Sequence, residues 1–385
     1  MSQPFELIAM PASREPVSLL AVDRAVSEIR RGRMVAIRGA GGKAMAVLAA
    51  EGVTRARLAE LETLGRSAPV LVITARRAAV LDLAQPTLNP IRLTMDGPLN
   101  AETVELLANP YTAPTLGDLR KKVAIRTAEV ERFGCENAGI GLAKIARLLP
   151  AVVVVPIEDP EADDLAAWAA RHDLLLADAG DIFQYEHTAA RRLAIVSEAK
   201  VPLLDAHETR IVAFRPLDGG LEHLAIVFGA PQPGDTVLTR IHSECFTGDL
   251  LGSLRCDCGD QLRGAIREIA AAGSGVLLYL SQEGRGIGLV NKLRAYALQD
   301  RGFDTLDANE QLGFDADERV YLPAAQMLRL LGFAKIRLMT NNPAKVNALA
   351  RCGVEVTERV RHAFPSNEHN EAYLGTKAAR FGHLF

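Results

Sequence analysis

Three cysteines in one short segment constrain this chain more than any other feature. The segment Arg240–Gln261 reads RIHSECFTGDLLGSLRCDCGDQ and places Cys245, Cys256 and Cys258 in a C-x10-C-x-C pattern. Thiolates bind zinc readily, and a site with three protein ligands leaves the fourth tetrahedral position for water, as in catalytic zinc sites. We interpret the cluster as a catalytic zinc site with one ion per chain. The alternative is a closed structural site completed by His242 or by a distant residue.

Length and charge set the broad class of the protein. A chain of 385 residues is long enough for two domains of ordinary size, each with its own core. A net charge of −3 gives no broad basic field, so neither nucleic acid nor an anionic membrane is expected as a partner. Apolar stretches such as Ala151–Pro156 are too short to span a bilayer. We expect a cytoplasmic protein whose five cysteines are reduced.

The first half of the chain has the pattern of an α/β domain. Apolar spacing predicts a helix over Val22–Arg31, followed by a buried strand at Met34–Ile37 and a glycine-rich turn at Arg38–Lys43. Further strands are expected at Val70–Thr74, Val123–Arg126, Val152–Ile157 and Leu174–Ala177. The Ala- and Leu-rich stretches between the strands are predicted to be helices.

The second half is predicted to open with an antiparallel sheet. Strands are expected at Thr209–Phe214, His223–Phe228 and Val237–Ile241, and a turn with the sequence PQPGD separates the last two. After Cys258 the apolar period changes to that of a helix, and Val276–Leu280 is the next strand. We therefore predict an α/β (α+β) fold with two domains, 1–192 and 193–385, each a mixed sheet with packed helices.

Three polar motifs in the second half are candidates for a functional site, and two of them are suited to binding a phosphate. The run Gln282–Gly286, QEGRG, lies between a strand and a helix, where glycines permit close approach and Arg285 can hold phosphate oxygens in a two-pronged contact. The run Asp315–Arg319, DADER, combines carboxylates with a guanidinium, although charge runs are also typical of solvated surfaces. Thr340–Pro343 has the pattern of a helix N-terminus, which favours anions.

In this order, the motifs resemble those of GTP cyclohydrolase II. The similarity covers Ala194–Phe385 and is carried by HSECFTGDLLGSLRCDCG, QEGRGIGLVNKLRAYALQDRGFDT, ANEQLGFDADER and TNNPAKV. The resemblance implies zinc-dependent hydrolysis of GTP to 2,5-diamino-6-ribosylamino-4(3H)-pyrimidinone 5′-phosphate, formate and pyrophosphate, the first step of riboflavin biosynthesis. It also implies Mg²⁺ bound with the GTP phosphates, and a homodimer.

The resemblance assigns roles to individual side chains. Asp317 takes part in proton transfer, Arg319 attacks or stabilises the α-phosphate, and Tyr296 fits the full ring-opening reaction. Because an arginine stays protonated, its electrostatic role is favoured over the covalent one. The implied GTP contacts are Arg240, Ile241, His242, Ser243, Glu244, Gln261, Glu283, Gly284, Arg285, Thr305, Thr340 and Lys345. The implied metal ligands are Cys245, Cys256 and Cys258.

The first half resembles 3,4-dihydroxy-2-butanone 4-phosphate synthase, which precedes GTP cyclohydrolase II in many bifunctional riboflavin enzymes. The similar stretches are AVDRAVSEIRRGRMVAI, LAAEGVT and RFGCENAGIGLAKIARLLPAVVVV. The acidic metal-binding run of that family is replaced here by RGAGGKAM, which has no carboxylate to bind Mg²⁺. A Gly-His-Thr-Glu type motif is replaced by Gly134-Cys135-Glu136-Asn137. We expect residues 1–192 to keep the scaffold without the synthase activity.

Two other functions fit parts of the sequence. One is a purine ring-opening enzyme of the same fold that serves another pathway. The other is a zinc-stabilised, nucleotide-binding scaffold without turnover, which the altered first half makes conceivable. The joint presence of Tyr296, Asp317, Arg319 and the three cysteines argues against the scaffold.

Overall fold

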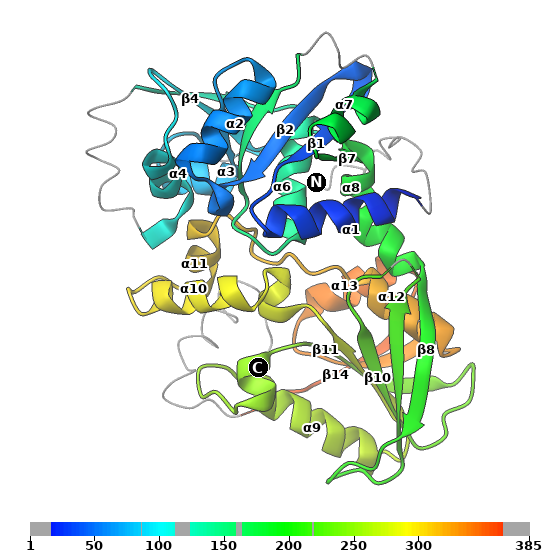
Figure 1. Cartoon of the computed structure of the whole chain (residues 1–385). Coiled ribbons are helices and arrows are strands. Elements are labelled where there is room, and N and C mark those ends of the chain that lie inside the picture. Colours follow the sequence, from blue (N-terminus) through cyan, green and yellow to red (C-terminus); the bar gives the residue numbers. More distant parts are fainter. Residues whose placement is uncertain (1–16, 86, 112–123, 159–163, 218, 365–385) are drawn as a thin grey trace, which may run out of the picture. The chain divides into compact units, whose positions relative to one another are not determined.

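The computed structural model describes residues 17–85, 87–111, 124–158, 164–217 and 219–364, and the chain divides into two compact units (Figure 1). The units are Met1–Tyr185 and Glu186–Phe385, so the division falls within helix α8, Ala179–Arg191. The boundary after residue 192 stays a prediction. Each unit contains a seven-stranded mixed sheet with packed helices, which confirms the predicted fold class. None of the described helices is long and apolar enough to cross a membrane.

The sheet of the first unit has the strand order β5-β4-β3-β6-β2-β1-β7. Only β1 and β7 pair in parallel, and the other neighbouring strands are antiparallel. The strands are β1 (Val35–Arg38), β2 (Ala44–Ala49), β3 (Val70–Ile73), β4 (Ile91–Met95), β5 (Ile125–Glu129), β6 (Ala151–Pro156) and β7 (Leu175–Asp178). The helices are α1 (Val17–Arg30), α2 (Arg55–Gly65), α3 (Ala75–Val80), α4 (Ala101–Ala108), α6 (Cys135–Ile145), α7 (Leu165–Arg171) and α8.

Two strands of this unit lie in stretches for which helices were predicted. The prediction is wrong at β2, because this alanine-rich segment is inserted between β1 and β6 and four of its side chains are fully buried. Alanine favours helices, but pairing with strands on both sides outweighs that weak preference. The prediction is also wrong at β4, where Ile91 and Leu93 face the core with period two. The strand expected from Val123 begins at Ile125 in the structure, and Val123 itself lies outside the described residues.

The sheet of the second unit has the order β14-β13-β11-β12-β10-β9-β8. Its strands are β8 (Leu193–Lys200), β9 (Thr209–Pro216), β10 (His223–Phe228), β11 (Thr236–Ser243), β12 (Gly275–Leu280), β13 (Lys335–Met339) and β14 (Glu355–Val360). Its helices are α9 (Cys258–Ala271), α10 (Leu289–Gln299), α11 (Thr305–Gln311), α12 (Leu322–Leu330) and α13 (Pro343–Arg351). The first strands pair antiparallel as predicted, whereas β11 pairs in parallel with β12 and β13, and β13 with β14.

Side-chain alternation divides this second sheet between two cores. On β12, Val276, Leu278 and Leu280 pack in a core with α12 and α13, whereas Leu277 packs with α9 on the opposite face. On β11, Ile241 belongs to the α12 and α13 side. Successive residues of a strand point to opposite faces, so its neighbours Arg240 and His242 point to the α9 side. The α9 face therefore carries the polar side chains of the site.

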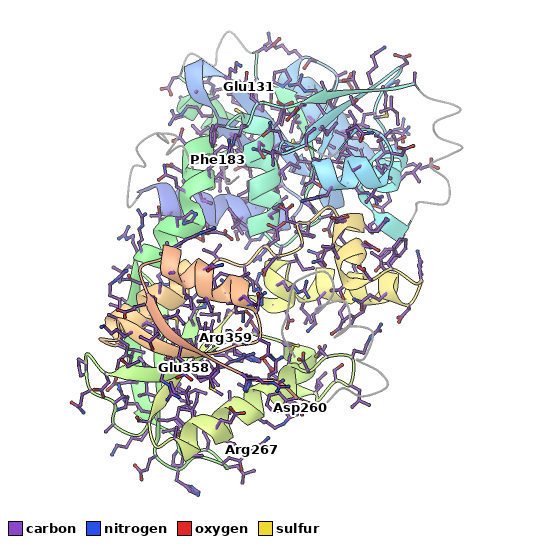
Figure 2. All side chains as sticks on the ribbon, turned by 180° about the vertical axis from the view of Figure 1, so that it is seen from behind. Glu131, Phe183, Asp260, Arg267, Glu358 and Arg359 are labelled. Carbon is purple, nitrogen blue, oxygen red and sulfur yellow. The ribbon has the colours of Figure 1, made fainter. Side chains whose placement is uncertain are left out.

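The outer strand β14 is protected by charge. Glu358, labelled in Figure 2, forms an ion pair of 2.6 Å with Arg337 on the neighbouring β13. Glu355 pairs with Lys335 in the same way at 3.4 Å. These pairs are exposed and contribute little to stability, but charged side chains on an outer strand hinder pairing with another chain.

The parallel strands bring the polar motifs to one edge of the sheet. The carboxyl ends of β11, β12 and β13 lie at Ser243, Leu280 and Met339, and Ser243 is paired with Leu280. Each strand is followed by one of the motifs singled out from the sequence. In α/β sheets, ligands bind outside the carboxyl ends of parallel strands. This edge is therefore the expected location of a binding site.

Candidate active site

One pocket at this edge of the sheet is lined by almost all of the residues proposed from the sequence. Those that line it are Arg240, His242, Ser243, Glu244, Cys245, Cys256, Cys258, Gln261, Glu283, Gly284, Arg285, Tyr296, Thr305, Asp317, Arg319, Thr340 and Lys345. Ile241 is the exception, because its side chain is buried in the core on the other face of the sheet. Its backbone oxygen still accepts a hydrogen bond of 3.3 Å from Lys345 Nζ.

Several lining residues had not been proposed from the sequence. They are Ile287, Lys292, Ala295, Gln299, Asn309, Asn341, Asn342 and His362. Lys292 could have been proposed from the sequence, since it lies four residues before Tyr296 in α10 and therefore on the same helical face. Asn341 and Asn342 had been interpreted only as part of a helix-capping run. Nothing in the local pattern around His362 pointed to the pocket.

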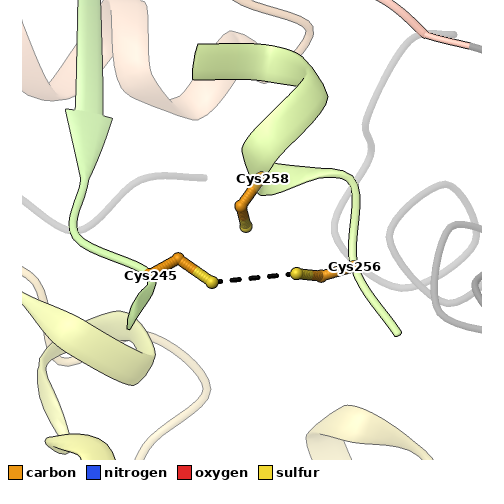
Figure 3. A group of neighbouring side chains, drawn as sticks. All are labelled: Cys245, Cys256 and Cys258. Carbon is orange, nitrogen blue, oxygen red and sulfur yellow. Dashed lines mark hydrogen bonds between the residues drawn. The ribbon is translucent and has the colours of Figure 1, made fainter. Parts of the chain in front are cut away.

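The three cysteine sulfur atoms point toward one another from separate elements (Figure 3). Cys245 follows β11, Cys256 lies in the loop after it, and Cys258 is the first residue of α9. The three Sγ atoms lie within 4.8 Å of one another, and the Cys245 and Cys256 sulfurs are 3.7 Å apart. Zinc to sulfur bonds of ~2.3 Å in a tetrahedron place two sulfurs about 3.8 Å apart. The cluster therefore fits a tetrahedral metal ion.

Among the described residues, no fourth metal ligand joins these three sulfurs. His242, the alternative fourth ligand, instead has Nε2 3.0 Å from Asp249 Oδ1. Within the described part of the chain, the cluster thus has three ligands, the number found in zinc sites with one open coordination position.

The cysteines differ in their proton affinity. Hydrogen bonds with the Cys256 and Cys258 thiols, and then with Lys292, lower the pKa of Cys245 far below its ordinary value. The hydrogen bond with Cys245 raises the pKa of Cys256 to about 11. One thiolate therefore shares the cluster with protonated thiols. A divalent cation would displace the remaining protons, because metal ligation requires thiolates.

Asp249 organises the start of the segment between β11 and α9, residues 244–257, which we call the metal-binding loop. Its carboxylate accepts hydrogen bonds from the Cys245 backbone nitrogen at 3.0 Å and from the Tyr279 hydroxyl at 2.9 Å, besides its contact with His242. Burial lowers the pKa of His242, so its ring is neutral at pH 7. With Nε2 donating to Asp249, Nδ1 carries the lone pair and has no hydrogen-bond partner among the described residues. His242, which lines the pocket, therefore has a buried acceptor nitrogen without a protein partner among the described residues.

A buried guanidinium links the sheet to α9. Arg240 donates to the Met339 backbone oxygen at 2.9 Å and to the side-chain oxygen of Gln261. Burial lowers the pKa of Arg240 to about 10, which still leaves it charged at neutral pH. Gln261 Oε1 is fixed by this contact, while its backbone oxygen accepts from His362 Nε2 at 2.9 Å.

The QEGRG turn and the DADER loop support each other. Gly284 and Arg285 both have left-handed backbone conformations, with φ of 63° and 64°. This conformation is strained for an arginine, and such strain is concentrated at functional sites. The Arg285 backbone oxygen accepts from the Glu318 nitrogen at 3.1 Å, and Arg285 Nη1 donates to the Ala316 oxygen at 3.3 Å. The turn therefore orients both its own guanidinium and the loop carrying Asp317.

Asp317 and Arg319 form a two-pronged ion pair. Arg319 Nε and Nη2 donate to the two carboxylate oxygens of Asp317 at 2.8 and 2.6 Å. Burial opposes ionisation of Asp317, but the charge and hydrogen bonds of Arg319, together with the charge of Arg285, lower the pKa of the carboxyl. Asp317 is therefore ionised at neutral pH, and Arg319 is held in a fixed orientation.

The third motif forms the amino end of α13. Asn342 caps this helix by accepting from the Ala344 nitrogen at 2.9 Å, and Thr340 Oγ1 accepts from the Asn342 nitrogen at 3.1 Å. The buried Lys345 brings a positive charge to the same end. Amide dipoles and an ammonium together favour an anionic group here. Thr305 lies at the start of α11, where its hydroxyl accepts from Gln299 Nε2 at 3.1 Å.

The chain is similar to known proteins over most of its length. The family model described as GTP cyclohydrolase II matches residues 194–361. A GTP cyclohydrolase-2 from Azospirillum brasilense is 55% identical over 371 residues, which cover 96% of this chain and 95% of the relative. A GTP cyclohydrolase-2 from Cronobacter sakazakii is 54% identical over 193 residues, 50% of this chain and 98% of the relative. A riboflavin biosynthesis protein RibBA from Parabacteroides distasonis is 34% identical, covering 96% of this chain and 98% of that protein.

Among solved structures, the chain is similar to RibBX, a two-domain 3,4-dihydroxy-2-butanone 4-phosphate synthase from A. baumannii. That likeness has a TM-score of 0.37 and 19% identity, and covers 89% of this chain and 99% of the other.

The fold and the pocket define an α/β enzyme with a three-cysteine cluster beside a group of basic side chains. The chain belongs to the GTP cyclohydrolase II family of riboflavin biosynthesis.

The close approach of Gly248 to the cysteine sulfurs allows a test of whether the cluster binds a metal ion. A Cβ atom on Gly248 would lie 2.8 Å from Cys256 Sγ and 3.0 Å from Cys245 Sγ. We predict that Gly248→Ala weakens binding of a metal ion about tenfold or more, since overpacking costs about 1–3 kcal/mol. Chelator competition measures the affinity. Gly252→Ala is the matched control, because it strains the same loop but its Cβ meets nothing within 4 Å. Wild-type affinity in Gly248→Ala would contradict the assigned geometry.

Proposed function

We propose that the chain hydrolyses GTP to 2,5-diamino-6-ribosylamino-4(3H)-pyrimidinone 5′-phosphate, formate and pyrophosphate, the first step of riboflavin biosynthesis. One observation carries the proposal. A single pocket combines a three-cysteine cluster with basic and acidic side chains from loops that follow three parallel strands. Opening the guanine ring and breaking a phosphoanhydride need different chemical groups, and this pocket contains both kinds.

Zinc is the proposed metal, with one ion per chain held by Cys245, Cys256 and Cys258. Thiolates are soft ligands that favour zinc over the hard cations, and the sulfur spacing supports tetrahedral binding. When bound, zinc supplies Lewis acidity that makes water nucleophilic near neutral pH. Mg²⁺ is proposed to enter with the GTP phosphates, as it commonly does in nucleotide enzymes.

The side chains of the pocket have separate proposed tasks. Burial raises the pKa of Tyr296 to about 12, so its hydroxyl keeps its proton and donates a hydrogen bond to the purine. Asp317 is the proposed group for proton transfer during ring opening, because its carboxyl is ionised at neutral pH and lies in the pocket. Arg319 stabilises charge at the α-phosphate, and its permanent protonation favours this electrostatic role over covalent attack.

The remaining lining residues are proposed to bind GTP. Arg285 and Lys345 supply positive charge, and the amino end of α13 at Thr340 supplies amides, all of which suit phosphate oxygens. Arg240, His242, Ser243, Glu244, Gln261, Glu283, Gly284 and Thr305 are the other proposed contacts. Ile241 contributes through its backbone, since its side chain is turned away from the pocket.

Product analysis tests this function. Mass spectrometry after incubation with GTP, zinc and Mg²⁺ should show the pyrimidinone phosphate, with formate and pyrophosphate released. Cys256→Ser should lose zinc and formate release together. Arg319→Ala should keep its zinc but lower the rate of pyrophosphate release by about 10²–10³-fold, the usual effect of losing one group that stabilises transition-state charge.

Arg337→Ala is the matched control for Arg319→Ala, because Arg337 lies in an exposed ion pair on β13. It should leave both activities unchanged. A product that retains the formyl group would contradict the proposed reaction, and loss of zinc from Arg319→Ala would make Arg319 a structural residue.

We further propose that the first unit lacks dihydroxybutanone phosphate synthase activity. The Arg38–Lys43 turn, which contains the short 3₁₀ turn Ala40–Gly42, carries two cations whose partners are already the carboxylates of Asp178 and Glu131. Burial raises the pKa of Cys135 to about 11, so this thiol is a poor replacement for a histidine base. Both features support a scaffold that assists assembly, stability or regulation.

The absence of synthase activity is measurable in the intact chain. We expect no formation of dihydroxybutanone phosphate from ribulose 5-phosphate with abundant Mg²⁺. The same preparation must convert GTP, which shows that the protein is folded and active. Formation of the four-carbon phosphate above the level of an enzyme-free control would overturn the proposal.

A homodimer is the proposed assembly. Leu250, Leu251, Leu254, Val290 and Leu293 are aliphatic side chains of the second unit that are more than half exposed. Exposed apolar groups of this kind support burial against a second copy. These residues lie in two segments, 250–254 and 290–293, which we propose as the interface. We predict that Leu293→Glu shifts the mass in light scattering toward the monomer, whereas Leu204→Glu, at an exposed position outside both segments, does not. A monomeric wild-type protein would contradict the assembly.

A further inference from the structure

A lysine with no role assigned above lies directly against the sulfur cluster. Lys292, on α10, is only 8% exposed. Its Nζ lies 2.9 Å from Cys245 Sγ, 2.9 Å from Thr247 Oγ1 and 2.8 Å from Glu283 Oε1. An isolated buried ammonium is costly, so this arrangement requires partners that compensate the charge.

These three contacts use the full donor capacity of the side chain. A lysine ammonium has three hydrogens and no acceptor, and each hydrogen has an acceptor here. Lys292 can contact a substrate only by giving up one of these bonds. Its position therefore indicates that it acts on the metal site rather than on the nucleotide.

Glu283 connects Lys292 to the metal-binding loop a second time. Its Oε2 accepts a hydrogen bond of 2.6 Å from the Phe246 backbone nitrogen, and Phe246 directly follows Cys245. Its Oε1 also accepts from the Gly284 nitrogen at 3.0 Å. A closed ring of contacts thus runs from Cys245 through Phe246, Glu283 and Lys292 back to the Cys245 sulfur. The ring joins the ends of β11 and β12 to α10.

The charges in this ring are arranged asymmetrically. Lys292 and Glu283 are neutral as a pair, but the ammonium is the member in contact with sulfur. Three thiolates around a divalent ion leave one excess negative charge. An ammonium hydrogen bond withdraws electron density from the sulfur that carries part of that charge. Outer partners of metal ligands orient them in the same way in other metal sites.

We propose that Lys292, held by Glu283, is a positioning residue of the metal centre, which orients the Cys245 sulfur and reduces its electron donation to the ion. Glu283 thereby acquires a structural task besides the GTP contact proposed for it. The inference rests on the proposed zinc site, and it concerns the second coordination sphere rather than the three ligands.

Metal affinity and spectroscopy test the proposal without measuring turnover. Lys292→Met removes both charge and donor, Lys292→Gln keeps a donor without charge, and Lys335→Met is a control on exposed β13. We expect Lys292→Met to bind zinc about 10–100-fold more weakly in chelator competition, as loss of outer partners usually does. Lys292→Gln should fall between this variant and the wild type, and Lys335→Met should match the wild type.

Cobalt substitution reports on the sulfur itself. Loss of the ammonium hydrogen bond raises the energy of the sulfur lone pairs, so the sulfur-to-cobalt charge-transfer band should move to longer wavelength in Lys292→Met. If that variant does not fold by circular dichroism, Glu283→Gln tests the same ring, because it removes the charge that holds the ammonium. A smaller shift in the same direction is expected from Glu283→Gln.

The outcomes separate this inference from the proposed function. A wild-type protein that binds neither zinc nor cobalt overturns both proposals. Metal binding by the wild type, with unchanged affinity and an unchanged band in the folded Lys292 variants, overturns the role of Lys292 alone. If only Glu283→Gln folds, wild-type affinity and spectrum in that variant overturn it equally.

Discussion

The parallel pairing of β11 with both β12 and β13 is the constraint on which the site depends. Because parallel strands end at the same edge, the loops after Ser243, Leu280 and Met339 must emerge side by side. Residues about a hundred positions apart in the chain therefore converge on one pocket. The alternation along β11 adds a second constraint, since it directs Arg240 and His242 to the α9 side and Ile241 to the core. The convergence of the loops and the direction of the β11 side chains both follow from the backbone, whatever ligand is bound.

Sequence patterns predicted the local parts of this site better than the contacts between them. The C-x10-C-x-C spacing predicted the sulfur cluster because cysteine has few other reasons to gather in a polar segment, and the glycine and capping runs predicted the turns around it. Lys292 was not singled out, because a lysine in a helix usually lies on the surface, and only the approach of α10 to the metal-binding loop makes it buried. Asp249 was missed for the same reason, since its three partners come from separate positions.

The fold of the first unit shows a similar limit. The run AMAVLA has the composition of a helix, and only its insertion between β1 and β6 makes it a strand. Pairing partners are distant in sequence, so no local window contains the information that decides between the two structures. The strand predicted at Val152–Ile157 is found as β6, one residue earlier at each end, because five consecutive apolar residues bounded by prolines leave little choice. In the second unit, likewise, the local capping run predicted the start of α13, whereas the parallel pairing of β11 with β12 and β13 is not visible in any local window.

The hydrogen bond between His242 and Asp249 has a consequence for the polarity of the pocket. Because Nε2 is committed to the carboxylate, the ring nitrogen left without a protein partner carries a lone pair. An atom with a lone pair pairs with an N–H or O–H group and not with an oxygen that carries only lone pairs, such as a phosphate oxygen. The guanidinium and ammonium groups of Arg285 and Lys345 have the opposite preference. The pocket therefore favours donor groups near His242 and negatively charged groups near Arg285 and Lys345. An asymmetric ligand is oriented by this difference.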